Sequence, residues 1–316
     1  MLIIFSALAA IIPMTIYLIL IWRFDKYDRE PFGMVLANYL WGAIGAIFLA
    51  LAGSLFLTII ISFFLKDDKS LGLIGAVVVA PFVEEITKGI FLLITVSNRK
   101  FDNITDGIVY GGAIGLGFGM TENFMYFAGN ADNLGSWIAI IIIRTLFSAV
   151  MHCVSTATLG AFLGYSKLMS KGKRIFYAIL GLLTAMFIHA AWNSSVSFQS
   201  TAPLGFLFLF ITVLIFITVF TVSVARERKI IFKELSEEAE KGIIPSAHLQ
   251  ILSSSVREQQ GWIPENIRKD YIKSATTLAF RKLQAKNSNG ASKIYYENDI
   301  DNYRKFISFL LSGIKV

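Results

Sequence analysis

The chain is poor in charged residues, in proline and in cysteine. Of its 316 residues, 16% are charged and 55% are hydrophobic, and there are 6 prolines. Soluble domains carry about 25% charged residues, so this composition excludes an ordinary soluble globular protein. The net charge of +7 does not call for a nucleic acid partner, because no arginine-rich or RNA-binding motif is present.

The single cysteine, Cys153, excludes an intramolecular disulfide bond and any CxxC metal or redox motif. It follows His152 directly, but neighbouring side chains on a helix point about 100° apart. A catalytic Cys/His pair is therefore not predicted, and Cys153 is interpreted as a small apolar core residue.

What the sequence does contain is long apolar runs, each long enough to cross a hydrocarbon core as a helix. The first run, 2–22, lacks the basic start and the A-x-A-like end of a signal peptide, so it is predicted to be a membrane span. The chain is therefore predicted to be an all-α polytopic membrane protein with about seven spans and a bundle over residues 1–224. The runs are 2–22, 34–64, 71–97, 107–128, 137–165, 176–197 and 204–224.

Lysine and arginine are distributed unevenly between the loops. Loops 23–32, 98–106 and 166–175 are basic, whereas loops 129–136 and 198–203 contain neither residue. Only Lys66 and Lys69 weaken the alternation. Because cytoplasmic loops carry an excess of lysine and arginine, we expect the N-terminus outside and the C-terminus in the cytoplasm of a bacterial cytoplasmic membrane.

Residues 225–316 change in character: charged residues become frequent, and apolar residues recur at helical spacing. Three helices are predicted in this cytoplasmic tail, the first ending near Gly242 and the second starting at Pro264. The third is predicted over 298–316. His248 has no neighbour at ligand spacing and is interpreted as a surface residue.

Ionisable residues interrupt four of the apolar runs, and such residues inside a membrane span mark a functional site. In 71–97, Glu84 and Glu85 are adjacent, and Lys88 lies one turn after Glu84, the favourable order for an ion pair. Glu85 is not expected to share that partner. Two carboxylates in different surroundings suit general acid/base chemistry, although a helix-packing ion pair is the alternative.

The run 107–128 combines a glycine ridge with an acidic residue. Gly111, Gly115 and Gly119 are spaced by four, the pattern that lets two membrane helices approach closely. On a helical wheel Glu122 lies on the same side, so its carboxylate is predicted to enter the helix contact. Asn123 lies on an adjacent face, where it could orient a carboxylate.

The last two charged runs supply histidine. In 137–165, Arg144 and His152 belong to one polar stripe; Arg144 either pairs with a glutamate or snorkels to the interface. In 176–197, His189 and Asn193 lie one turn apart and can address the same atom. Histidine can move a proton or bind a metal, and an asparagine amide can stabilise an oxyanion, but an interhelical hydrogen bond is the alternative.

Taken together, Glu84-Glu85-x-x-Lys88, Phe118-x-x-x-Glu122-Asn123, His152 and His189-x-x-x-Asn193 resemble the PrsW family of intramembrane proteases. That family belongs with the CAAX prenyl endopeptidase and bacteriocin-processing superfamily. The resemblance covers residues from about 20 to 224. Two departures matter: the prenyl endopeptidase branch has histidine in place of Glu122, and many PrsW-like proteins have aspartate in place of Asn193.

The resemblance implies an intramembrane endopeptidase that cleaves membrane-anchored proteins or peptides within the lipid bilayer. We predict that Glu84 or Glu85 activates water and that His189 and Asn193 stabilise the oxyanion. Glu122 and His152 are predicted either to orient that water or, together with His189, to bind a divalent metal, for which zinc is the expected ion. HExxH is absent, so a metal-free glutamate mechanism stays open.

Two other functions fit intramembrane charges: a proton-coupled transporter and a non-catalytic scaffold or immunity protein. A transporter favours two pseudo-symmetric halves, and the sequence shows no internal repeat. Nothing in the sequence indicates an oligomeric state.

Overall fold

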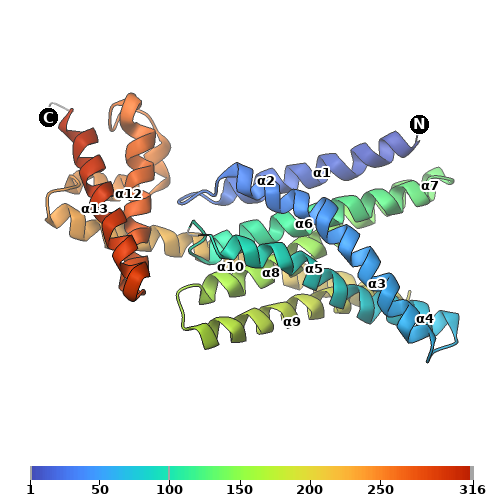
Figure 1. Ribbon diagram of the computed structural model, residues 1–316. Coiled ribbons are helices and arrows are strands. Elements are labelled where there is room, and N and C mark those ends of the chain that lie inside the picture. The colour runs from blue at the N-terminus through green and yellow to red at the C-terminus, as the bar shows by residue number, and fades with distance from the viewer. Residues whose placement is uncertain (1, 99, 314–316) are drawn as a thin grey trace. The chain divides into compact units, whose positions relative to one another are not determined.

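The computed structural model describes residues 2–98 and 100–313, and this part of the chain contains helices and no strand (Figure 1). The predicted all-α class is confirmed. The α-helices are α1 (Leu2–Phe24), α2 (Phe32–Leu40), α3 (Ile47–Ser62), α4 (Asp68–Ile74), α5 (Ala80–Val96), α6 (Ile104–Gly129), α7 (Leu134–Ile143), α8 (Ala149–Ser166), α9 (Lys171–Val196), α10 (Ala202–Glu240), α11 (Ser246–Leu252), α12 (Glu265–Lys286) and α13 (Gly290–Ser312).

Three helical rods contain a π-helical segment that joins two α-helices without a break. These segments are η1 (Trp41–Ala46) between α2 and α3, η2 (Gly75–Val79) between α4 and α5, and η3 (Arg144–Ser148) between α7 and α8. A π-helical turn is rare, and it is frequent at functional sites because it rotates the side chains that follow. Here η2 precedes the two glutamates of α5, and η3 begins at Arg144.

Five of the seven predicted spans coincide with helices that are long and apolar enough to cross a membrane: Leu2–Phe24, Phe32–Ser62, Leu134–Ser166, Lys171–Val196 and Ala202–Glu240. The other two predicted spans fall in α4 to α5 and in α6. These two rods carry Glu84, Glu85, Lys88 and Glu122, and such charges lower the hydropathy of a span.

The described chain divides into two compact units. One unit comprises residues up to Phe24 and Glu30–Phe220, and the other comprises Asp25–Arg29 together with Thr221 onward. Helix α10 contributes to both. The short segment Asp25–Arg29, which follows α1 in the sequence, is therefore part of the tail unit.

The first unit is organised around α6, whose residues from Thr105 to Gly119 are buried. Helix α8 lies against it so closely that glycine is required at the contact. A Cβ atom on Gly115 would overlap the carbonyl group of His152, and one on Gly111 would lie 2.5 Å from the carbonyl oxygen of Thr156. The predicted glycine ridge is confirmed, and it sets the depth at which α8 presents His152.

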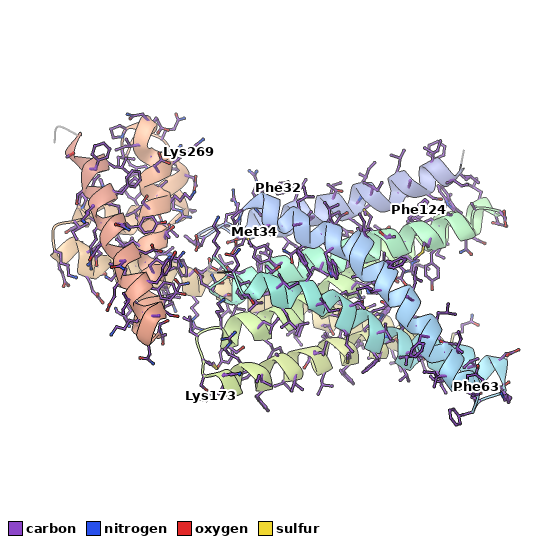
Figure 2. The ribbon with its side chains drawn as sticks, viewed as in Figure 1. Phe32, Met34, Phe63, Phe124, Lys173 and Lys269 are labelled. Carbon is purple, nitrogen blue, oxygen red and sulfur yellow. The ribbon has the colours of Figure 1, made fainter. Side chains whose placement is uncertain are left out.

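The outer surface of this unit is apolar. Large side chains such as Phe48 and Phe187 are 71% and 65% exposed, and Figure 2 shows side chains projecting from the helices on all visible sides. Exposed apolar surface of this extent is rare on soluble monomers and is typical of contact with lipid.

The tail unit has its own apolar core, formed by α10, α12, α13 and their connections. The predicted helix end near Gly242, whose φ of 72° suits glycine, and the predicted start at Pro264 are both confirmed. The third helix starts earlier than predicted, at Gly290. His248, predicted at the surface, is partly exposed there, but it also has partners: its Nδ1 lies 3.1 Å from the hydroxyl of Tyr271, and its ring packs edge-on against Trp262.

A buried arginine holds the segment Asp25–Arg29 within the tail unit. Arg257 is 4% exposed, and it donates hydrogen bonds of 2.7 Å each to the carbonyl oxygens of Lys26 and Tyr27. The fork of a guanidinium suits two neighbouring carbonyl groups. No sequence pattern indicated this contact, because it joins residues about 230 positions apart.

Candidate active site

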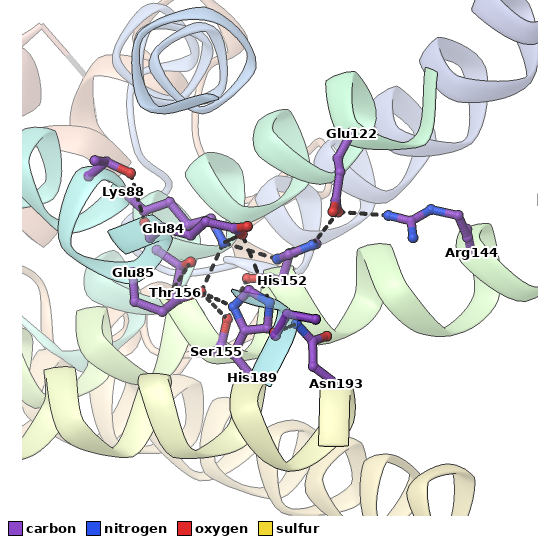
Figure 3. Close-up of polar contacts among 12 residues, drawn as sticks. Glu84, Glu85, Lys88, Glu122, Arg144, His152, Ser155, Thr156, His189 and Asn193 are labelled. Atoms are coloured by element: carbon purple, nitrogen blue, oxygen red, sulfur yellow. Dashed lines mark hydrogen bonds and ion pairs between the residues drawn. The ribbon is translucent and has the colours of Figure 1, made fainter. Parts of the chain in front are cut away.

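Four helical rods bring the ionisable residues of the bundle to one place (Figure 3). The side chains of Glu85, Lys88, His152 and His189 are at most 2% exposed. The predicted assembly of one polar centre is thus observed in the structure. The contributing residues are Glu84, Glu85 and Lys88 on α5, Glu122 and Asn123 on α6, Arg144 on η3, His152, Ser155 and Thr156 on α8, and His189 and Asn193 on α9.

Glu85 has partners on three helices. Its Oε1 atom lies 2.9 Å from Lys88 Nζ and 3.0 Å from His189 Nδ1, and it accepts a hydrogen bond of 3.1 Å from Ser155. Its Oε2 atom accepts one of 3.1 Å from Thr156. The expectation that Glu85 does not share Lys88 is therefore wrong, because tertiary contacts with α8 and α9 turn the carboxylate towards the bundle centre. Such a carboxylate fixes the orientation of His189.

Thr156 was missed by sequence reasoning. It follows His152 by one helical turn, and this spacing was a usable signal, since residues i and i+4 share a face. The apolar interpretation of Cys153 is confirmed, because this free cysteine is buried in the core cluster.

Lys88 lies within the centre, with Nζ fully buried. It is 3.4 Å from Glu84 Oε2 and 3.0 Å from His152 Nδ1, and it stands 3.9 Å from the centre of the Phe118 ring. A buried ammonium is stable only with such a set of acceptors around it.

Glu122 and Arg144 form a further ion pair of the centre. Arg144 donates from one terminal nitrogen to Glu122 Oε2 at 2.7 Å and from Nε to Asn123 Oδ1 at 3.0 Å. Its guanidinium also covers the Tyr126 ring at 3.7 Å. Of the two alternatives for Arg144, pairing with a glutamate is the observed one. The same Glu122 oxygen lies 2.6 Å from His152 Nε2, so Glu122 orients this histidine as Glu85 orients His189.

A metal-binding set of one carboxylate and two imidazoles is present. Glu84, His152 and His189 each offer one ligand atom, and these atoms lie within 4.8 Å of one another. His189 Nδ1 faces Glu85, so the other ring nitrogen, Nε2, points towards Glu84; the distance from Nε2 to Glu84 Oε2 is 3.9 Å. Two histidines and a glutamate are a ligand set of catalytic zinc sites, so the donor chemistry fits a divalent metal. The set differs from the predicted one in having Glu84 where Glu122 was expected.

Asn193 lies outside this set. Its amide nitrogen donates a hydrogen bond of 2.9 Å to the carbonyl oxygen of Ala76 in η2. Ala76 also lines an open cavity of about 920 Å³, together with Lys69, Gly72, Leu73 and residues 197–200 at the end of α9. The amide therefore ties α9 to η2 beside this cavity.

The apolar helical bundle, with a carboxylate and two histidines at its buried centre, defines a membrane protein with the ligands of a metal-dependent hydrolase. A family model described as PrsW family intramembrane metalloprotease matches residues 30–222. The chain belongs to this family, and it is a membrane peptidase rather than a carrier or a scaffold.

Curated relatives support the same assignment. The chain is 27% identical over 174 residues to Protease PrsW of Bacillus subtilis, covering 54% of this chain and 72% of the relative. It is 28% identical over 188 residues to Protease PrsW of Clostridioides difficile, covering 59% and 76%. The match to Protease PrsW of Geobacillus kaustophilus is 26% over 175 residues, covering 54% and 69%. No solved structure matches the chain.

Proposed function

We propose that this peptidase holds its metal with Glu84, His152 and His189 and cleaves a peptide bond of a membrane-anchored protein inside the bundle. The observation that carries the proposal is the approach of three ligand atoms from three helices to within 4.8 Å at a buried place. These three residues are far apart in sequence, and each is costly to bury in a membrane protein. Their meeting at one point is explained by a cation that all three bind. The ligand type favours zinc.

The chemistry divides among the residues by their contacts. A divalent metal, when bound, polarises the scissile carbonyl and lowers the pKa of water. Glu85 is fully engaged by Lys88, His189, Ser155 and Thr156, so it serves as an orienting group. Glu122 is the carboxylate left for proton transfer, because it is not in the proposed ligand set and its contacts with Arg144 and His152 both use Oε2, whereas Glu85 is engaged at both oxygens.

In this scheme Glu122 takes a proton from the attacking water as the oxygen–carbon bond forms. It returns the proton to the leaving amine nitrogen as the carbon–nitrogen bond breaks, so the protons balance. Arg144, at 2.7 Å, fixes the carboxylate throughout. Asn193 acts as a positioning residue, because its hydrogen bond to the carbonyl oxygen of Ala76 holds α9 against η2.

Metal removal tests the ligand set. The full chain purified in detergent is expected to contain about one zinc ion and to lose cleavage of a membrane-anchored reporter after chelation, with recovery on adding zinc back. His152→Ala and His189→Ala are each expected to lower metal content together with cleavage, since each removes a ligand. Elemental analysis and a gel assay measure the two quantities. Full metal content in both variants would contradict the proposed ligands.

We further propose that the N-terminus lies outside and the C-terminus in the cytoplasm, which the distribution of lysine and arginine supports. The cavity beside Ala76 then opens on the outer side, because the loop 198–203 that contributes to it lacks basic residues. Impermeant labelling of a cysteine introduced at Ser200 tests this orientation.

The same cavity is the proposed entry for the substrate chain. Gly72 lines it, and a Cβ atom at this position would meet no other atom within 4 Å, so Gly72→Phe is expected to narrow the cavity without distorting the helix. Cleavage is expected to fall about tenfold or more, since the scissile bond is misplaced, while the metal content stays unchanged. Gly75→Phe is the matched control, because Gly75 has the same free space and does not line the cavity. Equal activities of the two variants would exclude this entry.

A further inference from the structure

The position of Lys88 has a consequence for metal binding. Its Nζ atom lies 3.4 Å from Glu84 Oε2 and 3.0 Å from His152 Nδ1. Both partners belong to the proposed ligand set. The third ligand, His189, is reached indirectly, since Lys88 and His189 share the Glu85 oxygen Oε1 at 2.9 Å and 3.0 Å. The Lys88 ammonium therefore contacts two of the proposed ligands directly, and it is linked to the third through Glu85.

His152 shows the conflict most directly. Its Nε2 faces Glu122 at 2.6 Å and its Nδ1 faces Lys88 at 3.0 Å, so both ring nitrogens are engaged. An imidazole donates to a metal through a nitrogen lone pair, and it must give up one of these partners to do so. The Glu122 contact is further fixed by Arg144 at 2.7 Å. The contact with Lys88 is therefore the one expected to break, because the ammonium and a bound metal ion carry like charges and repel each other.

From these contacts we propose that Lys88 is a positioning residue that competes with the metal for Glu84 and His152 and thereby sets the metal affinity of the centre. The inference rests on the proposed ligand set. Lys88 keeps two partners when it releases these ligands: Glu85 at 2.9 Å and the face of the Phe118 ring at 3.9 Å. A carboxylate and an aromatic face can hold a buried ammonium, so release does not leave an unpaired charge.

A purely structural role for Lys88 predicts the opposite sign. If the ammonium only held Glu85 in place, its removal would loosen His189 and weaken metal binding. If it competes, its removal strengthens metal binding, because the ligands no longer share their charge with another cation. The sign of the change in metal affinity therefore separates the two roles, and it does not depend on measuring cleavage.

The experiment compares Lys88→Met with the wild type, using the full chain in detergent and a chromophoric chelator that competes for zinc. We expect about 10- to 100-fold tighter zinc binding in Lys88→Met. Zinc should also raise its unfolding temperature more than that of the wild type, since stabilisation grows with affinity. Lys88→Arg keeps the positive charge and is expected to restore the weaker binding.

Arg144→Met is the matched control, because it removes one partly buried cation that contacts Glu122 and Asn123 but no proposed ligand. We expect it to tighten zinc binding less than Lys88→Met does. If Arg144→Met tightens zinc binding as much as Lys88→Met does, the effect comes from net charge and direct competition is overturned. Unchanged or weaker zinc binding in Lys88→Met would also overturn direct competition. If Lys88→Met does not fold, Lys88→Gln serves in the same comparison. A triple variant that combines Glu84→Gln, His152→Ala and His189→Ala tests the ligand set separately from Lys88. Full zinc binding by this variant would overturn the proposed ligand set.

Discussion

Glu122→Gln is expected to lower the rate of peptide cleavage by about 10² to 10⁴ while the metal content stays that of the wild type, because glutamine keeps a side-chain oxygen that can accept from His152. Glu84→Gln is expected to abolish cleavage and to remove the bound metal. The difference follows from the geometry: Glu84 has an oxygen within 4.8 Å of both histidine ligand atoms, whereas Glu122 pairs with Arg144 and lies outside that set. The two changes are chemically identical, so each is the control for the other.

Stability must be followed in both variants. Glu122→Gln leaves the partly buried Arg144 without its carboxylate partner, and Glu84→Gln leaves Lys88 with one carboxylate fewer. Removing one member of a buried pair can cost about 3–5 kcal/mol, so thermal unfolding in detergent is measured beside cleavage and metal content. The assignment is contradicted if Glu122→Gln loses the metal, or if Glu84→Gln keeps the metal and the activity.

Much of the fold follows from composition alone. An apolar run of span length has one low-energy conformation in lipid, because every backbone group must form its hydrogen bond within the run. The spans, the tail helix that starts after Pro264 and the glycine ridge of α6 are therefore predictable from the sequence. The π-helical segments are not, because residue type does not distinguish an i→i+5 bond from an i→i+4 bond.

The ionisable members of the site were also predictable, since ionisable residues in membrane spans are costly and so rarely accidental. Their partners were not. Glu85 and Lys88 are three residues apart on α5, a spacing that permits their ion pair. The contacts of Glu85 with Ser155 and His189 depend instead on the relative rotation of α5, α8 and α9, which is set by packing. The presence of Glu84 in place of Glu122 in the proposed ligand set has the same cause. A helical wheel gives the face on which a carboxylate lies but not which neighbouring helix approaches it.

Packing of α8 on α6 is the geometric basis of the centre, and a single methyl group is expected to disturb it. In Gly115→Ala the new Cβ overlaps the backbone carbonyl of His152, a group that cannot move without moving α8. Overpacking of this kind costs about 1–3 kcal/mol. It also displaces His152 from Glu84 and His189, and a displacement of about 1 Å can reduce catalysis about 10²-fold.

Gly112→Ala is the matched control on the same helix. Its Cβ would meet Cys153 Sγ at 3.4 Å and Ile21 Cδ1 at 3.6 Å, which are ordinary contacts with side chains. Since alanine favours a helix over glycine by about 1 kcal/mol, Gly112→Ala is expected to be as stable as the wild type or more so, with cleavage retained. Thermal unfolding and reporter cleavage compare the two variants. Equal behaviour would show that α8 can move away from α6 at little cost, and the glycine ridge would then not be what positions His152.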